Sequence, residues 1–177
     1  MTWLETSSLS RPVVRRVLFL WLLPLVLLAG CGDSTPALKI GDAAPGFTVQ
    51  GLDGKEISLA DYQGSPVIVR FFLTDCKFCR ADTPVLNQYY SRYSAKGLRV
   101  LYIDTLGIDP ANLAAFAKEL AITFPVARDP GGKVAARYRV RALPQTIVLS
   151  PDHKIIAAIL GGLNEPELDR VLAPYLR

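Results

Sequence analysis

The feature that most constrains the fold is an apolar run from Val67 to Leu73, interrupted only by Arg70. A short apolar run that follows turn residues predicts a buried strand. Three residues after it comes the pair Cys76-Lys77-Phe78-Cys79, and beyond that apolar residues recur at helical spacing. A thiol at a helix N-terminus meets unpaired backbone N–H groups and the positive end of the helix dipole, which favour the thiolate. The sequence therefore predicts a reactive cysteine pair at a strand-to-helix junction.

The N-terminal segment differs in composition from the rest of the chain. An apolar stretch at residues 17–27 follows a group of arginines, Arg11, Arg15 and Arg16, and ends in Leu28-Ala29-Gly30-Cys31. This order resembles a bacterial lipoprotein signal, which implies cleavage before Cys31 and a lipid on its sulfur. A retained signal anchor stays open, although a membrane span needs about 20 apolar residues. Either interpretation places the domain outside the cytoplasm, on the periplasmic side if the bacterium is Gram-negative.

We therefore expect a signal peptide at residues 1–30, a lipidated flexible tether at 31–38 and one domain at 39–177. The segment 32–36 is small and polar, as a tether requires. The length that remains after cleavage suits a single core. The net charge of +4 owes part of its value to the arginines of the signal. Because no basic stripe with interleaved aromatic residues is present, nucleic acid is not an expected partner.

Turn residues and apolar runs alternate through the domain and predict strands and helices in turn. We expect a hairpin from residues 47–49 and 56–59, a helix after Cys79 that stops at Gly97, and a strand at 98–103. Then follow a helix at 110–120, a short strand and helix within 124–138, a hairpin from 145–149 and 154–160, and a last helix capped by Asn164. This order predicts an α/β fold with a central mixed sheet flanked by helices.

Taken together, these motifs resemble the thioredoxin-like TlpA/ResA family of membrane-tethered thiol-disulfide oxidoreductases. The likeness covers residues 39–177 and rests on segments 41–47, 76–84, 124–126, 129–130, 132–135 and 142–146, with Tyr138 and Val140. It implies a thioredoxin-like fold with an N-terminal β-hairpin extension and a βα insertion, in a protein expected to be monomeric. It also implies protein thiols and disulfides as substrates, apocytochrome c among them, and a membrane thiol carrier as electron donor. No cofactor is implied beyond the redox-active disulfide Cys76–Cys79.

Other uses of a cysteine pair need features that can be checked in the sequence. A structural zinc site needs four ligands, and only Cys31 and His153 remain to supply the other two. Attachment of c-type haem needs a histidine directly after the second cysteine, where this chain has Arg80. An inert structural disulfide stays open, although a bridge that closes so short a loop constrains the unfolded chain little.

The two cysteines are expected to have different roles. Cys76, the N-terminal and usually more exposed member, attacks the disulfide of the partner as a thiolate. Cys79, one helical turn inward, then attacks the mixed disulfide and releases the reduced partner. Lys77 either favours the thiolate through its charge or is a solvated surface lysine. Phe78 either contacts a partner or is ordinary packing.

The resemblance assigns a second part of the site to Leu143 and Pro144. In thioredoxin-like folds a cis-proline loop faces the cysteines, and its backbone pairs with an extended substrate. A trans proline that merely begins a strand is the alternative. Just upstream, Arg137, Arg139 and Arg141 alternate in the sequence. This alternation predicts an extended segment with the three guanidinium groups on one side.

Two positions depart from the thioredoxin-like pattern. Asp75 stands where tryptophan is common, and its carboxylate opposes formation of the Cys76 thiolate. Arg70, six residues before Cys76, stands where thioredoxin has a buried acid that assists proton transfer, which an arginine cannot do. Three interpretations of Arg70 stay open: an ion pair with Asp75 or another acid, stabilisation of a thiolate, or a partly exposed structural role. Glu119 and Asp104 are candidates for the missing acid.

Two further functions stay open. The opening 44–47 also occurs in peroxiredoxin-like thiol peroxidases, which place a threonine three residues and a proline seven residues before the peroxidatic cysteine. Here Leu73 and Val69 hold those positions. The other is a non-catalytic module that binds a partner or handles copper. A copper-handling protein would be expected to add a histidine near the dithiol, and the sole histidine, His153, falls in a predicted turn. The leading hypothesis is a lipid-tethered thiol-disulfide oxidoreductase, without a metal site, that reduces partner disulfides.

Overall fold

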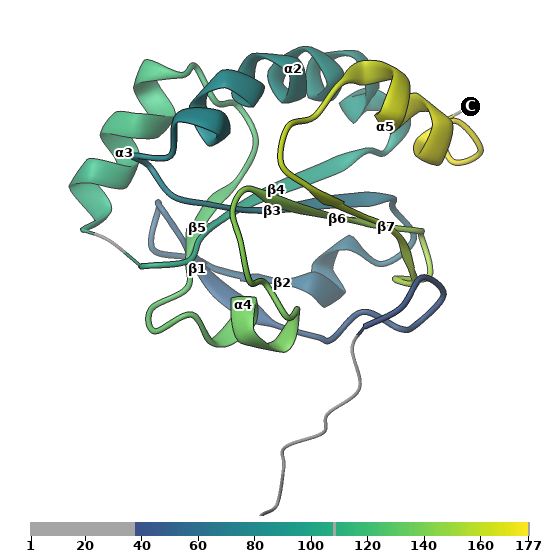
Figure 1. Ribbon diagram of the computed structural model, residues 1–177, viewed down its shortest axis with the longest axis horizontal. Helices are drawn as coiled ribbons and strands as arrows, with labels where there is room; N and C mark the ends of the chain where they lie inside the picture. The colour runs from purple at the N-terminus through teal and green to yellow at the C-terminus, as the bar shows by residue number, and fades with distance from the viewer. Residues whose placement is uncertain (1–37, 108, 177) are drawn as a thin grey trace, which may run out of the picture. The chain divides into compact units, whose positions relative to one another are not determined.

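A computed structural model describes residues 38–107 and 109–176 (Figure 1). In chain order its elements are β1 (Thr48–Gly51), β2 (Glu56–Ser58), β3 (Val67–Phe72), α2 (Lys77–Tyr93), β4 (Arg99–Asp104), α3 (Pro110–Glu119), β5 (Val126–Arg128), α4 (Lys133–Arg137), β6 (Gln145–Leu149), β7 (Ile155–Leu160) and α5 (Glu165–Leu172). No helix within the described ranges is long and apolar enough to cross a membrane. The signal peptide predicted for residues 1–30 and the lipidation site Cys31 lie outside these ranges.

The strands form one seven-stranded sheet in the order β2-β1-β5-β4-β3-β6-β7. Strand β4 runs parallel to β3 and β5, whereas the remaining neighbours are antiparallel. The two predicted hairpins are present as β1–β2 and β6–β7. The mixed sheet that the alternating sequence pattern predicts is therefore confirmed.

Local sequence signals set the helix ends. Asp109 caps α3 and Asn164 caps α5, each by accepting a hydrogen bond from the backbone N–H three residues further on. A proline follows within the first two positions of both helices, where its missing N–H costs nothing. After α2 a short 3₁₀ helix, Ser94–Lys96, ends at Gly97 with a φ of 96°. Glycine adopts this left-handed conformation without the steric cost that other residues meet.

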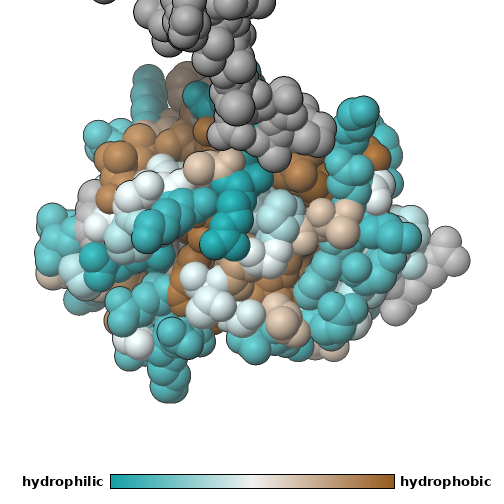
Figure 2. All heavy atoms as spheres, turned by 90° about the horizontal axis from the view of Figure 1, so that it is seen from below, coloured by the Kyte–Doolittle hydropathy of each residue, from teal (hydrophilic) through white to brown (hydrophobic). Residues whose placement is uncertain are grey.

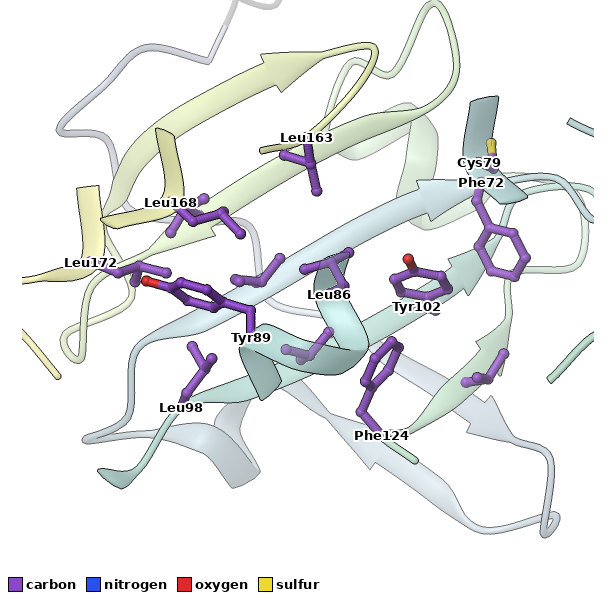
Figure 3. Close-up of a cluster of buried hydrophobic side chains, with 14 of the residues drawn as sticks. Phe72, Cys79, Leu86, Tyr89, Leu98, Tyr102, Phe124, Leu163, Leu168 and Leu172 are labelled. Atoms are coloured by element: carbon purple, nitrogen blue, oxygen red, sulfur yellow. The ribbon is translucent and has the colours of Figure 1, made fainter. Parts of the chain in front are cut away.

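The central strands bury both of their faces. Ile68 and Phe72 of β3 pack toward α2, α3 and α5, whereas Val67, Val69 and Phe71 pack toward α4. Figure 1 shows α2 and α5 above the sheet and α4 below it, and Figure 3 shows the upper core. Because strand side chains alternate, Arg70 faces α2 together with Ile68 and Phe72. The single charge in the strand thus points into the helix-covered side of the sheet.

The face around α4 is seen from below in Figure 2. Polar residues cover most of it, with smaller apolar areas between them. The helix itself is short and exposes Lys133, Ala136 and Arg137 while it buries Val134 and Ala135. This side of the domain therefore has the mixed character of an ordinary solvent-exposed surface.

The segment after α4 differs from the expectation. Arg137 is the last residue of the helix and Arg139 has a φ of 56°, so the alternating arginines do not lie along an extended segment. The carboxylate of the buried Asp129 accepts hydrogen bonds of 2.9–3.0 Å from the N–H groups of Val134 and Ala135. These bonds satisfy donors at the start of α4 and so favour a helix there.

Candidate active site

The two cysteines form a disulfide at the N-terminus of α2, with their Cα atoms 5.2 Å apart. Cys76 is the N-cap residue, and its Sγ accepts a hydrogen bond of 3.2 Å from the backbone N–H of Cys79. The first turn of α2 holds no acidic side chain. Backbone N–H groups and the helix dipole therefore act on the Cys76 sulfur, as the sequence position predicts.

Cys76 and Cys79 differ in accessibility. Cys76 is half-buried, whereas Cys79 is fully buried and belongs, with Phe72, to the upper core (Figure 3). A disulfide in solution can be attacked only at a sulfur that another molecule reaches. The arrangement suits Cys76 for contact with a partner and Cys79 for the internal step.

The loop that contains Pro144 lies at the same edge of the sheet as the disulfide. Phe71 pairs with Gln145, so the chain that leaves β3 toward Cys76 lies beside the chain that enters β6. The peptide bond between Leu143 and Pro144 is cis. The Pro144 carbonyl accepts a hydrogen bond of 2.8 Å from Gly161 N–H, which joins this loop to the end of β7.

Exposed apolar side chains gather at this edge. Phe78 lies between the cysteines, Leu106 follows the end of β4, and Leu160 ends β7 beside the proline loop; each is about two-thirds exposed. Lys77 and Asp75 are also exposed, next to the half-buried Cys76. The disulfide is thus bordered by apolar and charged groups that a docking protein can reach.

Arg70 is fully buried, which excludes the partly exposed role. One of its terminal nitrogens donates a hydrogen bond of 2.7 Å to Thr146 Oγ1 on β6. The other pairs with Asp82 Oδ2 on α2 at 2.5 Å, where the Asp82 side chain is 14% exposed. The acid that pairs with Arg70 is thus Asp82 and not Asp75. The arginine therefore links three elements beneath the disulfide.

Asp82 is the site residue that sequence reasoning missed. It lies three residues after Cys79, and side chains at that spacing in a helix are neighbours. Gly162 lies close to its carboxylate, since a Cβ at that position would be 3.6 Å from Asp82 Oδ1. The spacing of Cys79 and Asp82 was visible in the sequence, but nothing in it showed that Arg70 of the neighbouring strand would face this carboxylate.

A second buried polar contact joins the same helix turn to β4. Thr83 Oγ1 donates a hydrogen bond of 2.9 Å to the carbonyl of Cys79 and lies 3.4 Å from the Tyr102 hydroxyl. Burial raises the pKa of Tyr102 to about 12, against an opposing effect of the Arg70 charge. Tyr102 therefore stays a neutral phenol in the pH range of thiol chemistry.

The two candidates for the missing acid occupy different places. Glu119 is exposed on α3 and pairs with Arg80, whose guanidinium also donates a hydrogen bond of 3.1 Å to the Thr74 carbonyl. This arginine ties the loop before Cys76 to α3. Asp104 is fully buried at the end of β4, where its carboxylate accepts a hydrogen bond of 3.4 Å from Leu106 N–H. Only Asp104 shares the buried setting of the acid in thioredoxin.

The residues relevant to a copper-handling module or a thiol peroxidase either lie away from the disulfide or lack the polar groups that these functions need. His153 follows β6 at the edge of the sheet opposite Pro144. In the described part of the chain, no group of three or more His, Cys, Asp and Glu side chains is placed to hold a metal ion. Val69 is fully buried on the α4 side, and Leu73 is half-buried. Neither supplies the hydroxyl or the proline of the peroxidase pattern.

The mixed sheet, the disulfide at the N-terminus of α2 and the adjoining cis-proline loop define a thioredoxin-like thiol-disulfide oxidoreductase. Residues 40–158 match the AhpC/TSA family, and the chain belongs to this family. Thiol-disulfide oxidoreductase ResA of Bacillus thuringiensis subsp. konkukian is 33% identical to it over 165 residues, which cover 89% of this chain and 95% of that protein. The protein of the same name from Geobacillus thermodenitrificans is 30% identical over 92% of this chain and 95% of its own length.

A solved structure shows the same fold. The crystal structure of a candidate thiol:disulfide interchange protein DsbE from Chlorobium tepidum superposes with a TM-score of 0.73 at 27% identity, over 80% of this chain and all of that chain. The fold and the enzyme class that the sequence resemblance implies are therefore confirmed. The chain is a thiol-disulfide oxidoreductase of the ResA and DsbE type.

Proposed function

We propose that this enzyme reduces disulfides in partner proteins outside the cytoplasm. The observation that carries the proposal is the division of the disulfide into a half-buried Cys76 and a fully buried Cys79 at the start of α2. The exposed Asp75 carboxylate supports the direction, since a negative charge next to Cys76 disfavours the thiolate and hence the reduced form.

The reaction takes two exchanges of thiolate for disulfide. The reduced enzyme attacks a partner disulfide with the Cys76 thiolate, which forms a mixed disulfide and releases one partner thiolate. Cys79, as a thiolate after loss of its proton, then attacks the Cys76 sulfur and releases the second partner thiolate. The partner gains two electrons, and the enzyme is left with the Cys76–Cys79 disulfide seen in the structure. A dithiol donor must return two electrons to close the cycle.

The surroundings of the disulfide suit an extended protein segment as substrate. Phe78, Leu106 and Leu160 offer apolar contacts on the edge that carries the disulfide. Because Gly161 N–H already binds the Pro144 carbonyl, Leu143 is the residue of the cis-proline pair whose backbone we assign to substrate pairing. Main-chain pairing makes few demands on sequence, so several protein substrates fit, including the apocytochrome c that the family resemblance implies.

The proposed electron donor is a thiol carrier in the membrane, because an oxidising compartment does not supply reducing equivalents. The lipoprotein-like signal with Cys31 supports a tether that would hold the enzyme beside such a donor. Anchoring of this kind would confine the domain to the membrane surface.

The reduction potential of the Cys76–Cys79 couple tests the proposal. Full-length protein in detergent would be equilibrated with glutathione or dithiothreitol, and its thiols would be trapped and weighed by mass spectrometry. We expect a reversible couple near that of thioredoxin, about −270 mV, rather than near that of a strong oxidant, about −120 mV. A value near the latter would reverse the proposed direction. Rapid oxidation by peroxide at catalytic rates would instead favour the thiol peroxidase.

The lipid anchor is tested separately from the chemistry. In a bacterial host the protein is expected to incorporate labelled fatty acid and to sediment with membranes. Cys31→Ala should lose the label while it retains the reversible couple, because Cys31 is not one of the two bonded cysteines. Unchanged labelling of the Cys31→Ala protein would place the lipid elsewhere, and the absence of label from both proteins would favour the retained signal anchor.

A further inference from the structure

Arg70 occupies an unusual position for a charged side chain. It lies in the middle of the central strand β3, and no part of it reaches solvent. Burial of a guanidinium is costly unless charge and hydrogen bonds compensate for the lost water. Here Asp82 supplies the opposite charge and Thr146 supplies a neutral acceptor, whereas the Arg70 Nε has no hydrogen-bond partner within the described residues. The guanidinium is therefore fixed in place, and its contacts compensate only partly for the loss of hydration.

This fixed cation lies close to the buried sulfur. Asp82 follows Cys79 by three residues in α2, and side chains at that spacing have Cβ atoms about 5–6 Å apart. Arg70 contacts Asp82 from the sheet side, so the pair lies one helical turn below Cys79. Cys79 and Arg70 are both fully buried, and the Asp82 side chain is only 14% exposed, so little water reaches the space between them. Charges at this range in a largely buried site change ionisation equilibria more than charges in water do.

We propose that Arg70 is a positioning residue that sets the redox equilibrium of the Cys76–Cys79 couple by offsetting the Asp82 carboxylate beneath Cys79. This inference rests on the proposed exchange function. Reduction converts the disulfide into two thiols, with two electrons and two protons taken up, and loss of a proton then leaves a thiolate. An unpaired carboxylate below Cys79 disfavours that anion, and the guanidinium opposes the effect. The hydrogen bond that Arg70 donates to Thr146 ties the guanidinium to the strand that follows Pro144.

Other charged groups around the couple act from known positions. Some of these groups lie at the surface, on α2, on the loop before it or on α3, and the others are buried in the sheet. They are Asp75, Lys77, Arg80 with its partner Glu119, Tyr102 and Asp104. Thr146 on β6, which contacts Arg70, and Gly162 between β7 and α5, which lies next to Asp82, carry no charge. None of these charged or titratable groups is changed in the variants below, so they do not alter the sign of the comparison.

The test compares charge removal from the two partners. The equilibrium constant with glutathione would be measured on the full-length protein at about pH 9, above the usual titration of a thiol. Arg70→Met should shift the equilibrium toward the disulfide by about tenfold, and Asp82→Asn should shift it toward the dithiol by a similar factor. The double variant should return toward the starting value. At about pH 6, where a smaller share of the thiols is ionised, all shifts should shrink.

Matched variants distinguish an effect of charge on the redox equilibrium from a loss of structure. Arg70→Lys keeps the charge and should keep the equilibrium, whereas Thr146→Val keeps both charges and should change stability with little change in the equilibrium. If Arg70→Met does not fold, comparison of Asp82→Asn with the double variant still gives the direction in which each charge shifts the redox equilibrium. Shifts of the same sign in both single variants, or none in either, would overturn the role of Arg70. Absence of a reversible couple in the unmodified protein would instead overturn the proposed function itself.

Discussion

Cys79→Ser is expected to stop the reaction after its first step and to leave the protein bonded to its substrate through Cys76. The half-buried Cys76 can still attack, but the buried sulfur that would resolve the mixed disulfide is gone. Turnover should fall by roughly a thousandfold or more, as when a reacting group is removed from an enzyme. Insulin reduction would measure the rate, and non-reducing electrophoresis with mass spectrometry would identify the adduct.

The order of the two steps is tested by the companion variants. Cys76→Ser should lose turnover to the same extent and form no adduct, because the remaining Cys79 is fully buried. Cys31→Ser removes the third cysteine and should leave exchange unchanged in detergent, which makes it the control for cysteine removal in general. An adduct on Cys79 in the Cys76→Ser protein would reverse the assigned roles. No adduct in any variant would contradict the assignment of exchange to this pair.

Much of the fold could be predicted because its signals are local. The run Gln145–Leu149 is a strand with the predicted bounds, since consecutive β-branched and apolar residues between a proline and a turn leave few alternatives. Helix α3 begins at Pro110 as expected, because Asp109 caps it within one turn of sequence. The position of Cys76 at the start of α2 follows from the same kind of pattern.

The parts that were not predicted depend on contacts between distant segments. The alternating arginines predicted an extended segment, yet Arg137 ends α4 and Arg139 has a left-handed φ of 56°. Arg70 could be recognised as unusual, but its partners come from α2 and β6, at separations of 12 and 76 residues. Side-chain pairing of this kind is decided by packing, which a single sequence does not specify.

Asp82→Ala is expected to destabilise the oxidised protein by about 3–5 kcal/mol, the usual cost of stranding one member of a buried ion pair. The reason is that Arg70 is fully buried and cannot turn to solvent once its partner is lost. Arg70→Met should cost less, about 1–3 kcal/mol, because the Asp82 side chain is already 14% exposed and can be solvated. Urea denaturation of the disulfide form would give each free energy of unfolding.

The double variant decides whether these costs come from charge. Arg70→Met combined with Asp82→Ala removes both charges, so the protein should be more stable than the Asp82→Ala single variant even though it carries one more substitution. Arg92→Met gives a matched control at an exposed ion pair with Glu165, where the Arg92 side chain is 51% exposed, and should cost less than about 1 kcal/mol. Additive losses in the double variant would mean that Arg70 and Asp82 stabilise the fold by packing alone. In that case the cation beneath Cys79 would not be held by its partner, and the electrostatic link between the sheet and the disulfide would lose its basis.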